Sequence, residues 1–339
     1  ARIDNHRCAR TGVPEVIYSV SRYGGLIRLR SSFSRLVSSC LTIGSGGSAG
    51  PEAPVVMSGA AIGSNIGKCL GMNDRQRITL VGCGTAGAIA AIFNAPIAGL
   101  VFAMEVILGE WKMVNIIPIA IAAVAGAEVS HAIFPEQVLF NHQPFSVGFQ
   151  DSIAGLFLAL FTALISVFFT KALRQSGKWS GMTGLPIYTR AILGGCCVGL
   201  IGMVFPVVLG EGYHFIQSMI HGTFSMGLAV TFVAVFGKIA ATALTLGWGG
   251  SGGIFAPCLL IGSLCGVFFH KALFMVFPEI GCAGEGVYAL MGMAGIVSGV
   301  MQAPLTGIFL IVEITNGYES MLPVIVVSAI SSTMSHYIE

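Results

Sequence analysis

One glycine-rich element occurs twice in this chain, and its residue types suit the binding of a small ion. The first copy covers residues 46–54 and the second, 203 residues later, covers residues 249–257. Both copies read G-G-S-x-G-x-x-A-P, and each leads directly into an apolar stretch. A Gly-rich break that opens a helix in a very hydrophobic chain is typical of a membrane ion site, where two half-helix N-termini face each other near the bilayer midplane.

The chemistry of such an element comes from its backbone amides. The start of a helix leaves about four N–H groups unpaired and carries roughly half a positive charge. Glycine lets the chain bring these N–H groups against a ligand, and proline is tolerated there because its missing N–H would be unpaired anyway. Each copy is therefore predicted to cradle an anion, since a cation site would need carbonyls and several carboxylates. A pair of turns that only pack helices is the alternative.

The two copies differ in one carboxylate. Glu52 lies in the first copy, whereas the second carries only the apolar side chains of Ile254 and Phe255. An acidic side chain at membrane depth is expected to be functional. As a carboxylate, Glu52 would occupy the anion cradle itself, and when protonated or displaced it would admit an anion. It is predicted to act as a gate or a proton carrier, and the alternative is that it only caps its helix.

The composition predicts an all-α, polytopic membrane protein. Of the 339 residues, 55% are hydrophobic and only 9% are charged, against about 25% charged in a soluble domain. Several apolar stretches reach the roughly 17–25 residues that cross a bilayer, and shorter ones suit broken or re-entrant helices. The 46 glycines would let such helices approach closely. This composition disfavours a soluble all-α protein.

A second repeated element supports an internal duplication. Residues 94–105 and 302–313 share the pattern A-P-x-x-G-x-x-x-x-x-E at an offset of 208. Two collinear matches at nearly one offset predict a single transmembrane domain, 1–339, with repeat halves of about 1–133 and 150–339. Repeats in transporters commonly have inverted topology, with the substrate at their interface.

A coarse pass along the chain gives about a dozen helices, bounded by Gly, Pro and charged clusters. One helix is expected over 95–109, and a longer one over 150–176 that would end in the polar stretch 175–184. Seven arginines crowd the first 35 residues, which suggests the cytoplasmic side. Nucleic-acid binding is the rival reading, but no basic or aromatic module accompanies them.

The sequence offers no support for a metal site or an enzyme. The nine cysteines form no C-x-x-C pair, and the seven histidines show no ligand spacing. No Ser-His-Asp, metal or nucleotide fingerprint lies in a plausible context. We therefore expect no metal, no cofactor and no catalytic residue.

The chain resembles the CLC family of chloride channels and chloride/proton antiporters. Residues 50–54 are similar to the family's G-[KR]-E-G-P motif, with Pro51 and Ala53 as departures. Residues 253–257 match G-x-F-x-P without change, and residues 10–15 are similar to the G-S-G-I-P element. The resemblance covers nearly the whole chain, and its motifs follow the family's order.

The resemblance implies a role for each matching residue. Glu52 corresponds to the gating glutamate, and the replacement of the motif's basic residue by Pro51 removes a positive charge beside the gate. Arg35 falls near the family's anion pathway, or it is a snorkelling arginine at the membrane interface. Chloride is expected to be held by backbone amides and one hydroxyl of a set that comprises Thr11, Gly12, Gly50, Gly253, Ile254 and Phe255.

One departure bears on the mechanism. Antiporters of the family typically have a second glutamate after the helix acid, which passes protons to the inner side. Here Val106 follows Glu105, and valine cannot hold a proton. We therefore expect selective chloride permeation through a voltage- and pH-gated passive channel with Glu52 as its gate. A chloride/proton antiporter is the alternative, and a non-transporting membrane protein is less favoured.

The resemblance also implies partners and location. It predicts a homodimer in which each subunit has its own path for chloride and similar anions, with an interface near 95–133 and 303–338. The protein would be multi-pass, in a cell (plasma or inner) membrane, without a nucleic-acid partner. The family's preceding N-terminal helices and its central-tyrosine segment are expected to be absent, since Tyr337 lies too early for that role.

Overall fold

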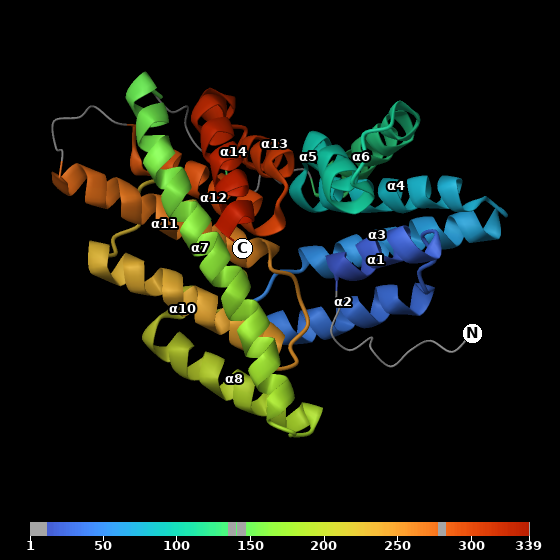
Figure 1. Ribbon diagram of the computed structural model, residues 1–339, viewed down its shortest axis with the longest axis horizontal. Helices are drawn as coiled ribbons and strands as arrows, with labels where there is room; N and C mark the ends of the chain where they lie inside the picture. Colours follow the sequence, from blue (N-terminus) through green and yellow to red (C-terminus); the bar gives the residue numbers. More distant parts are fainter. Residues whose placement is uncertain (1–11, 135–139, 141–146, 277–282, 339) are drawn as a thin grey trace. The chain divides into compact units, whose positions relative to one another are not determined.

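The computed structural model describes residues 12–134, 140, 147–276 and 283–338. This part of the chain forms fourteen α-helices and no extended strand (Figure 1), which confirms the predicted all-α fold. Seven segments in these ranges are long and apolar enough to cross a membrane, as expected for a multi-pass membrane protein. They are α4 (Asp74–Phe93), α6 (Met113–Ile133), α7 (Phe149–Met182), α8 (Ile187–Val204), α10 (Leu228–Gly247), α11 (Phe255–Val276) and Tyr318–Ile338, which contains η4 (Tyr318–Ser320) and α14 (Met321–Ile338).

The chain divides into two compact units that exchange short segments. The first comprises Ala1–Cys40, Pro51–Glu136 and Ser251–Gly253, and the second comprises Leu41–Gly50, Gln137–Gly250 and Ile254–Glu339. Both exchanged segments belong to the glycine-rich elements. The single domain with two repeat halves remains a prediction.

In the first unit, α3 (Glu52–Cys69) packs against α4 through glycine. A Cβ atom added to Gly59 would collide with the backbone of Gly84, and one added to Gly63 would collide with the backbone of Leu80. Only glycine permits this approach of two helix backbones. α6 packs against α4, and the short α5 (Pro96–Phe102) contacts both.

The connection between α1 (Val13–Tyr23) and α2 (Leu29–Gly44) is bonded by several side chains, among them a buried serine of α3. Ser64 of α3 donates its hydroxyl to the C=O of Gly25 at 2.6 Å and accepts the N–H of Ile27 at 2.9 Å. These bonds satisfy buried backbone groups of the turn, which would otherwise cost stability. The turn therefore stays on α3.

The second unit repeats the packing of the first. α11 packs against α12 (Glu285–Met301), α12 against α14, and α13 (Pro304–Thr315) against both α12 and α14. A Cβ added to Gly262 or Gly266 would collide with the backbone of α12, and these glycines follow Gly59 and Gly63 by the same 203 residues as the glycine-rich element. The sequence duplication is thus a duplication of helix packing.

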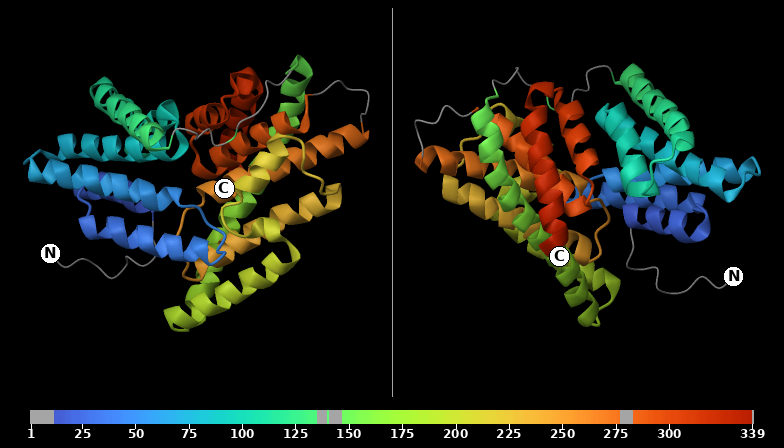
Figure 2. Two further views of the ribbon diagram at one scale, coloured as in Figure 1. Left: turned by 180° about the vertical axis from the view of Figure 1, so that it is seen from behind. Right: turned by 45° about the horizontal axis from the view of Figure 1, so that its top comes forward.

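The remaining helices of the second unit lie around α10. α10 runs between α8 and α11, and α7 packs against α10, α12 and α14 (Figures 1 and 2). The short η3 (Pro206–Val208) and α9 (Tyr213–Ile220) follow α8 in the chain.

The polar stretch 175–184 does not break α7 as expected from the sequence. The helix continues to Met182 and is followed by Gly184 in the left-handed region, with φ of 62°. Ser176 is buried, and its hydroxyl donates to the C=O of Ala243 in α10 at 2.7 Å. Packing against α10 therefore overrides the weak helix propensity of serine and glycine.

The second repeated element keeps one backbone conformation in both copies. The helix before it ends at Asn94 in one copy and at Gln302 in the other, with φ of 50° and 55°. The following alanines have φ/ψ of −131°/81° and −134°/80°. The copies then diverge, because the predicted helix over 95–109 is divided into α5 and a π-helical turn, η2 (Ala103–Leu108), whereas α13 remains α-helical to Thr315.

Candidate functional site

Both glycine-rich turns are closed by the same backbone hydrogen bond. The N–H of Gly47 donates to the C=O of Thr42 at 2.9 Å, and the N–H of Gly250 donates to the C=O of Thr245 at 2.8 Å. The glycine before each donor has positive φ, 90° in one copy and 116° in the other. Glycine is required there because other L-residues rarely adopt such angles. The repeat therefore begins at the threonine and reads T-x-G-x-G-G-S-x-G-x-x-A-P, an extension that the sequence analysis missed.

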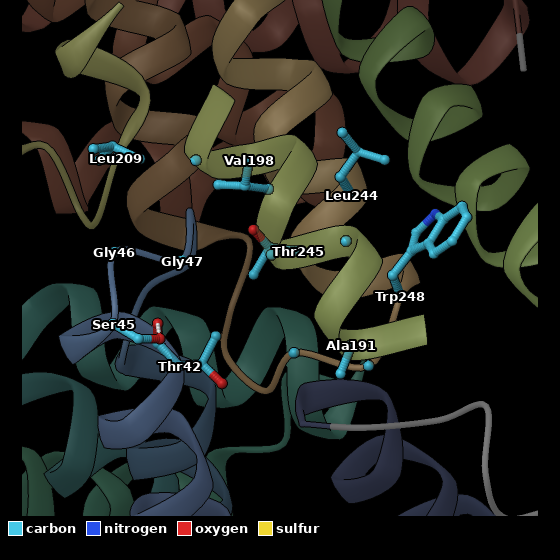
Figure 3. A pocket seen from close by; sticks show the side chains of 15 residues that line it. Thr42, Ser45, Gly46, Gly47, Ala191, Val198, Leu209, Leu244, Thr245 and Trp248 are labelled. Carbon is cyan, nitrogen blue, oxygen red and sulfur yellow. Dashed lines mark hydrogen bonds between the residues drawn. The ribbon is translucent and has the colours of Figure 1, made fainter. Parts of the chain in front are cut away.

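Both turns line one cavity of the second unit, with a volume of about 330 Å³. Figure 3 shows Gly46 and Gly47 on one side of it and Trp248 on another. None of the residues that line it is charged. Nearly half of its wall residues are glycine, namely Gly46, Gly47, Gly194, Gly195, Gly199, Gly249 and Gly250.

Ser48 fastens the first turn to α10. It is fully buried, its N–H donates to the hydroxyl oxygen of Thr245 at 3.1 Å, and its hydroxyl lies 2.8 Å from that of Thr242. Both threonine hydroxyls donate to carbonyls one turn earlier in α10, those of Lys238 and Ala241. Each threonine oxygen is therefore an acceptor for Ser48, which donates twice. This buried, satisfied network holds the turn in one place.

The serine of the second copy, Ser251, bonds the helix that precedes the first turn. Ser38 of α2 donates its hydroxyl to the hydroxyl of Ser251 at 2.9 Å, within the first unit. α2 is the helix that leads into the first turn, as α10 leads into the second. The serine of each turn therefore bonds the helix that precedes the other turn.

Glu52 and Gly12, both expected at the anion site, lie close together in the first unit. Glu52 is the first residue of α3 and is 1% exposed, behind Pro51, which offers no side-chain cap. Gly12 precedes α1 with φ of 84°, and a Cβ added to it would lie 3.2 Å from that of Ala53. Two helix N-termini thus meet around Glu52, where their dipoles favour negative charge. Thr11 lies outside the described residues.

Ile254 and Phe255 stand at the start of α11 in the second unit. Phe255 is the first helical residue and is 5% exposed, and the C=O of Ile254 accepts the N–H of Cys258 at 2.9 Å. This is the N-terminal geometry expected of the second cradle. The convergence of Glu52 with these two residues on one anion remains a prediction, as do the roles of Gly50 and Gly253.

Arg35 has a partner on its own unit. Its guanidinium lies 3.6 Å from the carboxylate of Glu15, and the side chains are 30% and 34% exposed. The pair links α2 to α1. A half-exposed pair of this length contributes little to stability, and the place of Arg35 on an anion pathway remains a prediction.

Glu105 and Val106 lie in the π-helical turn η2. The turn ends at Gly109, whose φ is 65°, and both side chains are half-buried. π-turns occur frequently at functional sites, and nothing in the sequence pattern indicated one. Among the described residues, no group of three His, Cys, Asp or Glu side chains could hold a metal ion.

The chain is similar to known proteins of one family. The family model for the voltage gated chloride channel matches residues 3–336. The H(+)/Cl(-) exchange transporter ClcA of Vibrio cholerae serotype O1 is 33% identical over 303 residues, which cover 84% of this chain and 62% of that protein. A protein of Ralstonia nicotianae with the provisional name of ClcB-like chloride channel protein is 29% identical over 334 residues, covering 96% of this chain and 77% of its own.

The fold is also that of solved structures. The crystal structure of a slow cyanobacterial Cl−/H+ antiporter has a TM-score of 0.84 and 22% sequence identity, and the match covers 98% of this chain and 80% of that one. The chain spans about three fifths of the length of its ClcA relatives, since the match covers 62% of them. With a family model matched from residue 3 to 336 and a relative at 33% identity, this chain belongs to the CLC family, the voltage-gated chloride channels.

Proposed function

We propose that the chain transports chloride, and that it exchanges chloride for protons. The observation that carries the proposal is Glu52, a carboxylate that is 1% exposed at the start of α3, beside the N-terminus of α1. A buried acid at a site that suits anions can alternate with the transported anion and carry a proton when it is neutral. The ClcA relatives are named as exchangers, and this favours exchange over the passive channel expected from Val106.

The glycine-rich turns serve this function because they place neither charged nor large side chains along the cavity by which the anion would approach the site. The cavity that they line in the second unit has no charged wall residue and is rich in backbone surface. A chloride ion that enters such a cavity meets amide dipoles rather than a fixed cation, so that it is not bound too tightly to leave. The tight turns then present helix N-termini as the binding groups.

Exchange requires a route for the proton of Glu52 to the inner side. Residue 106 does not supply it, because valine has no ionisable group. In this proposal the proton reaches the inner side by a path that does not use residue 106. A passive channel remains the second candidate, and Val106 is the observation in its favour.

We also infer that the protein is a homodimer that joins through α6, α13 and α14. Only 17% of the apolar stretch of α6 is buried within the chain, and its exposed side chains include Ile117, Ile121, Val124 and Val129. Membrane helices associate through close packing rather than through hydrophobicity, and these side chains lie on the side of α6 away from Ala123 and Ala127, which are buried within the chain. Cross-linking of single cysteines placed along α6, in protein reconstituted in liposomes, would test the homodimer. If no such variant gives a cross-linked dimer, the proposed interface is refuted.

The function is tested with purified protein in liposomes under a chloride gradient, with proton and chloride movements recorded together. Exchange predicts that the chloride gradient drives protons uphill at a fixed ratio. Glu52→Gln is expected to abolish proton movement and the pH dependence of chloride flux. Glu110→Gln is a matched control, because this carboxylate pairs with Lys112 at 2.7 Å on an exposed loop.

Each outcome of the liposome experiment distinguishes one function from the others. Chloride flux that never moves protons would establish the passive channel instead. Absence of any anion flux from intact protein would overturn both transport readings, and unchanged flux in Glu52→Gln would remove the assigned gate.

A further inference from the structure

A stripe of three polar side chains runs along one face of the apolar helix α10. It consists of Lys238, Thr242 and Thr245, which follow one another at intervals of four and three residues and so share a helix face. All three are buried, with exposures of 0%, 0% and 8%. Polar groups at membrane depth are costly and are commonly kept for a function. We call these residues the polar stripe.

Lys238 uses its ammonium group to hold a loop. Its Nζ donates to the C=O of Val208 at 3.0 Å and to the C=O of Gly210 at 2.8 Å. Gly210 and Gly212 have φ of 58° and 86°, and these left-handed conformations let the chain turn back between η3 and α9. The two bonds come from one buried side chain and satisfy two carbonyls, so the loop 208–210 is fixed to α10.

The loop in turn touches the first glycine-rich turn. The N–H of Gly210 donates to the C=O of Gly46 at 3.4 Å. On the other side of the turn, Thr242 and Thr245 receive the two hydrogen bonds of Ser48. The polar stripe therefore holds the turn at both of its ends, once directly and once through the loop.

The ammonium group is not placed to bind the transported ion. Lys238 is not among the residues that line the cavity, whereas Thr245 is. Two of its three N–H bonds already point at backbone carbonyls. Its charge is also felt by Glu211, since it lowers the pKa of that carboxyl group against the larger rise that burial causes.

We propose that the polar stripe is the positioning device of the gate. Lys238 fixes the carbonyls of the loop 208–210, and through them the turn at residues 46–48, which leads into the helix that begins with Glu52. Lys238 acts on the gate without touching the anion. The inference rests on the proposed role of Glu52, but its first test needs no transport.

The first test is amide hydrogen exchange of peptides from the purified protein. In Lys238→Met, which keeps the length of the side chain and removes the donors, the amides of 46–48 are expected to exchange about tenfold faster, because local opening becomes easier. Lys271→Met is the matched control, since Nζ of Lys271 also bonds two loop carbonyls, those of Phe224 at 3.3 Å and Met226 at 2.8 Å. It is expected to loosen its own loop and to leave 46–48 unchanged.

Unchanged protection of 46–48 in Lys238→Met would overturn the proposal. If that variant fails to fold, Thr242→Val tests the stripe instead, because it removes the acceptor of the Ser48 hydroxyl and otherwise costs only the bond of Thr242 to the C=O of Lys238 within α10. The same peptide is expected to exchange faster, and full protection there would refute the stripe as the anchor.

The second test is chloride flux as a function of pH and of chloride concentration. Lys238→Met is expected to shift the pH profile of the flux and to leave the KM for chloride unchanged, and Lys238→Arg is expected to restore the profile. On a Glu52→Gln background the substitution at 238 should no longer affect the profile. A raised KM with an unmoved profile would mean that Lys238 attracts the anion, which overturns positioning. Absence of chloride flux in the unaltered protein would refute the proposed function. The amide hydrogen-exchange test of the polar stripe would still be valid, because it does not depend on transport.

Discussion

The closest helix packing of the second unit predicts the effect of a single methyl group. A Cβ atom added to Gly266 in α11 would collide with the C=O of Tyr288 in α12 and lie 2.8 Å from the N of Ala289. Both are backbone atoms in helices, so no side chain can move aside. α11 and α12 would have to separate by roughly 1 Å, which forfeits about a quarter to a half of the dispersion energy of the contacting atoms.

Gly266→Ala is therefore expected to lower the free energy of unfolding by about 1–3 kcal/mol, the usual cost of overpacking. Gly177→Ala is the matched control, because Gly177 lies inside α7 with nothing within 4 Å of an added Cβ. There the same change should raise stability by about 0.4–1 kcal/mol, since it removes freedom from the unfolded chain.

The two variants are compared by thermal unfolding in one detergent, followed by the loss of the monodisperse peak in size-exclusion chromatography. The sign of the shift in apparent Tm should differ between them. The reasoning is refuted if Gly266→Ala is as stable as Gly177→Ala, because the backbones of α11 and α12 would then not be in contact.

Further predictions concern single side chains. Glu52→Gln should make chloride flux independent of pH, and a flux that still follows pH would assign the titrating group elsewhere. Burial raises the pKa of Glu211 above its ordinary 4.5, and the nearby Lys238 opposes this rise. An acid with a raised pKa stabilises the folded state at low pH, where it is protonated. The unaltered protein should therefore lose stability relative to Glu211→Gln as the pH rises through that pKa. Equal pH profiles of Tm would contradict this. The buried carboxylate of Asp151 accepts the hydroxyl of Tyr288 at 3.0 Å, and a double-mutant cycle of Asp151→Asn with Tyr288→Phe should give a coupling of about 1 kcal/mol. A coupling near zero would mean that this bond contributes nothing.

Most of the helices could be predicted from the sequence because glycine, proline and polar clusters mark their ends. α1 runs over Val13–Tyr23 and α13 over Pro304–Thr315, close to the segments that these signals delimit. The errors have one cause, which is tertiary packing. α7 continues through a polar stretch because Ser176 and Gly247 hold it against α10, and no local signal reports a partner that lies 67 residues away in the chain.

Only part of the candidate site could be predicted from the sequence. Glu52 and Gly12 are marked by motifs, and the structure places the segments that carry them together. Of the polar stripe, only Thr245 belongs to the repeated element, and the link of Thr242 to Ser48 joins residues 194 positions apart, which no local pattern reports. The π-helical turn at Glu105 was missed for a similar reason, since its sequence reads as ordinary helix.

The anchoring of the two serines says more about the duplication than the sequence match does. Ser48 bonds α10, which precedes the second turn, and Ser251 bonds α2, which precedes the first. Each serine therefore contacts, within its own unit, the helix that precedes the other copy of the turn. Inverted topology of the two halves, as found in transporters, remains a prediction.

The two copies of the turn share some features and differ in others. Both turns keep the threonine, the closing hydrogen bond and the left-handed glycine. The first is anchored by two threonines and, through the loop 208–210, by the buried Lys238, and it alone leads into a carboxylate. In the proposed function Glu52 is the gate, and a gate has to return to one position after each displacement. The proposal therefore accounts for the firmer anchor of the copy that carries Glu52, whereas the copy with Phe255 would only present its helix N-terminus.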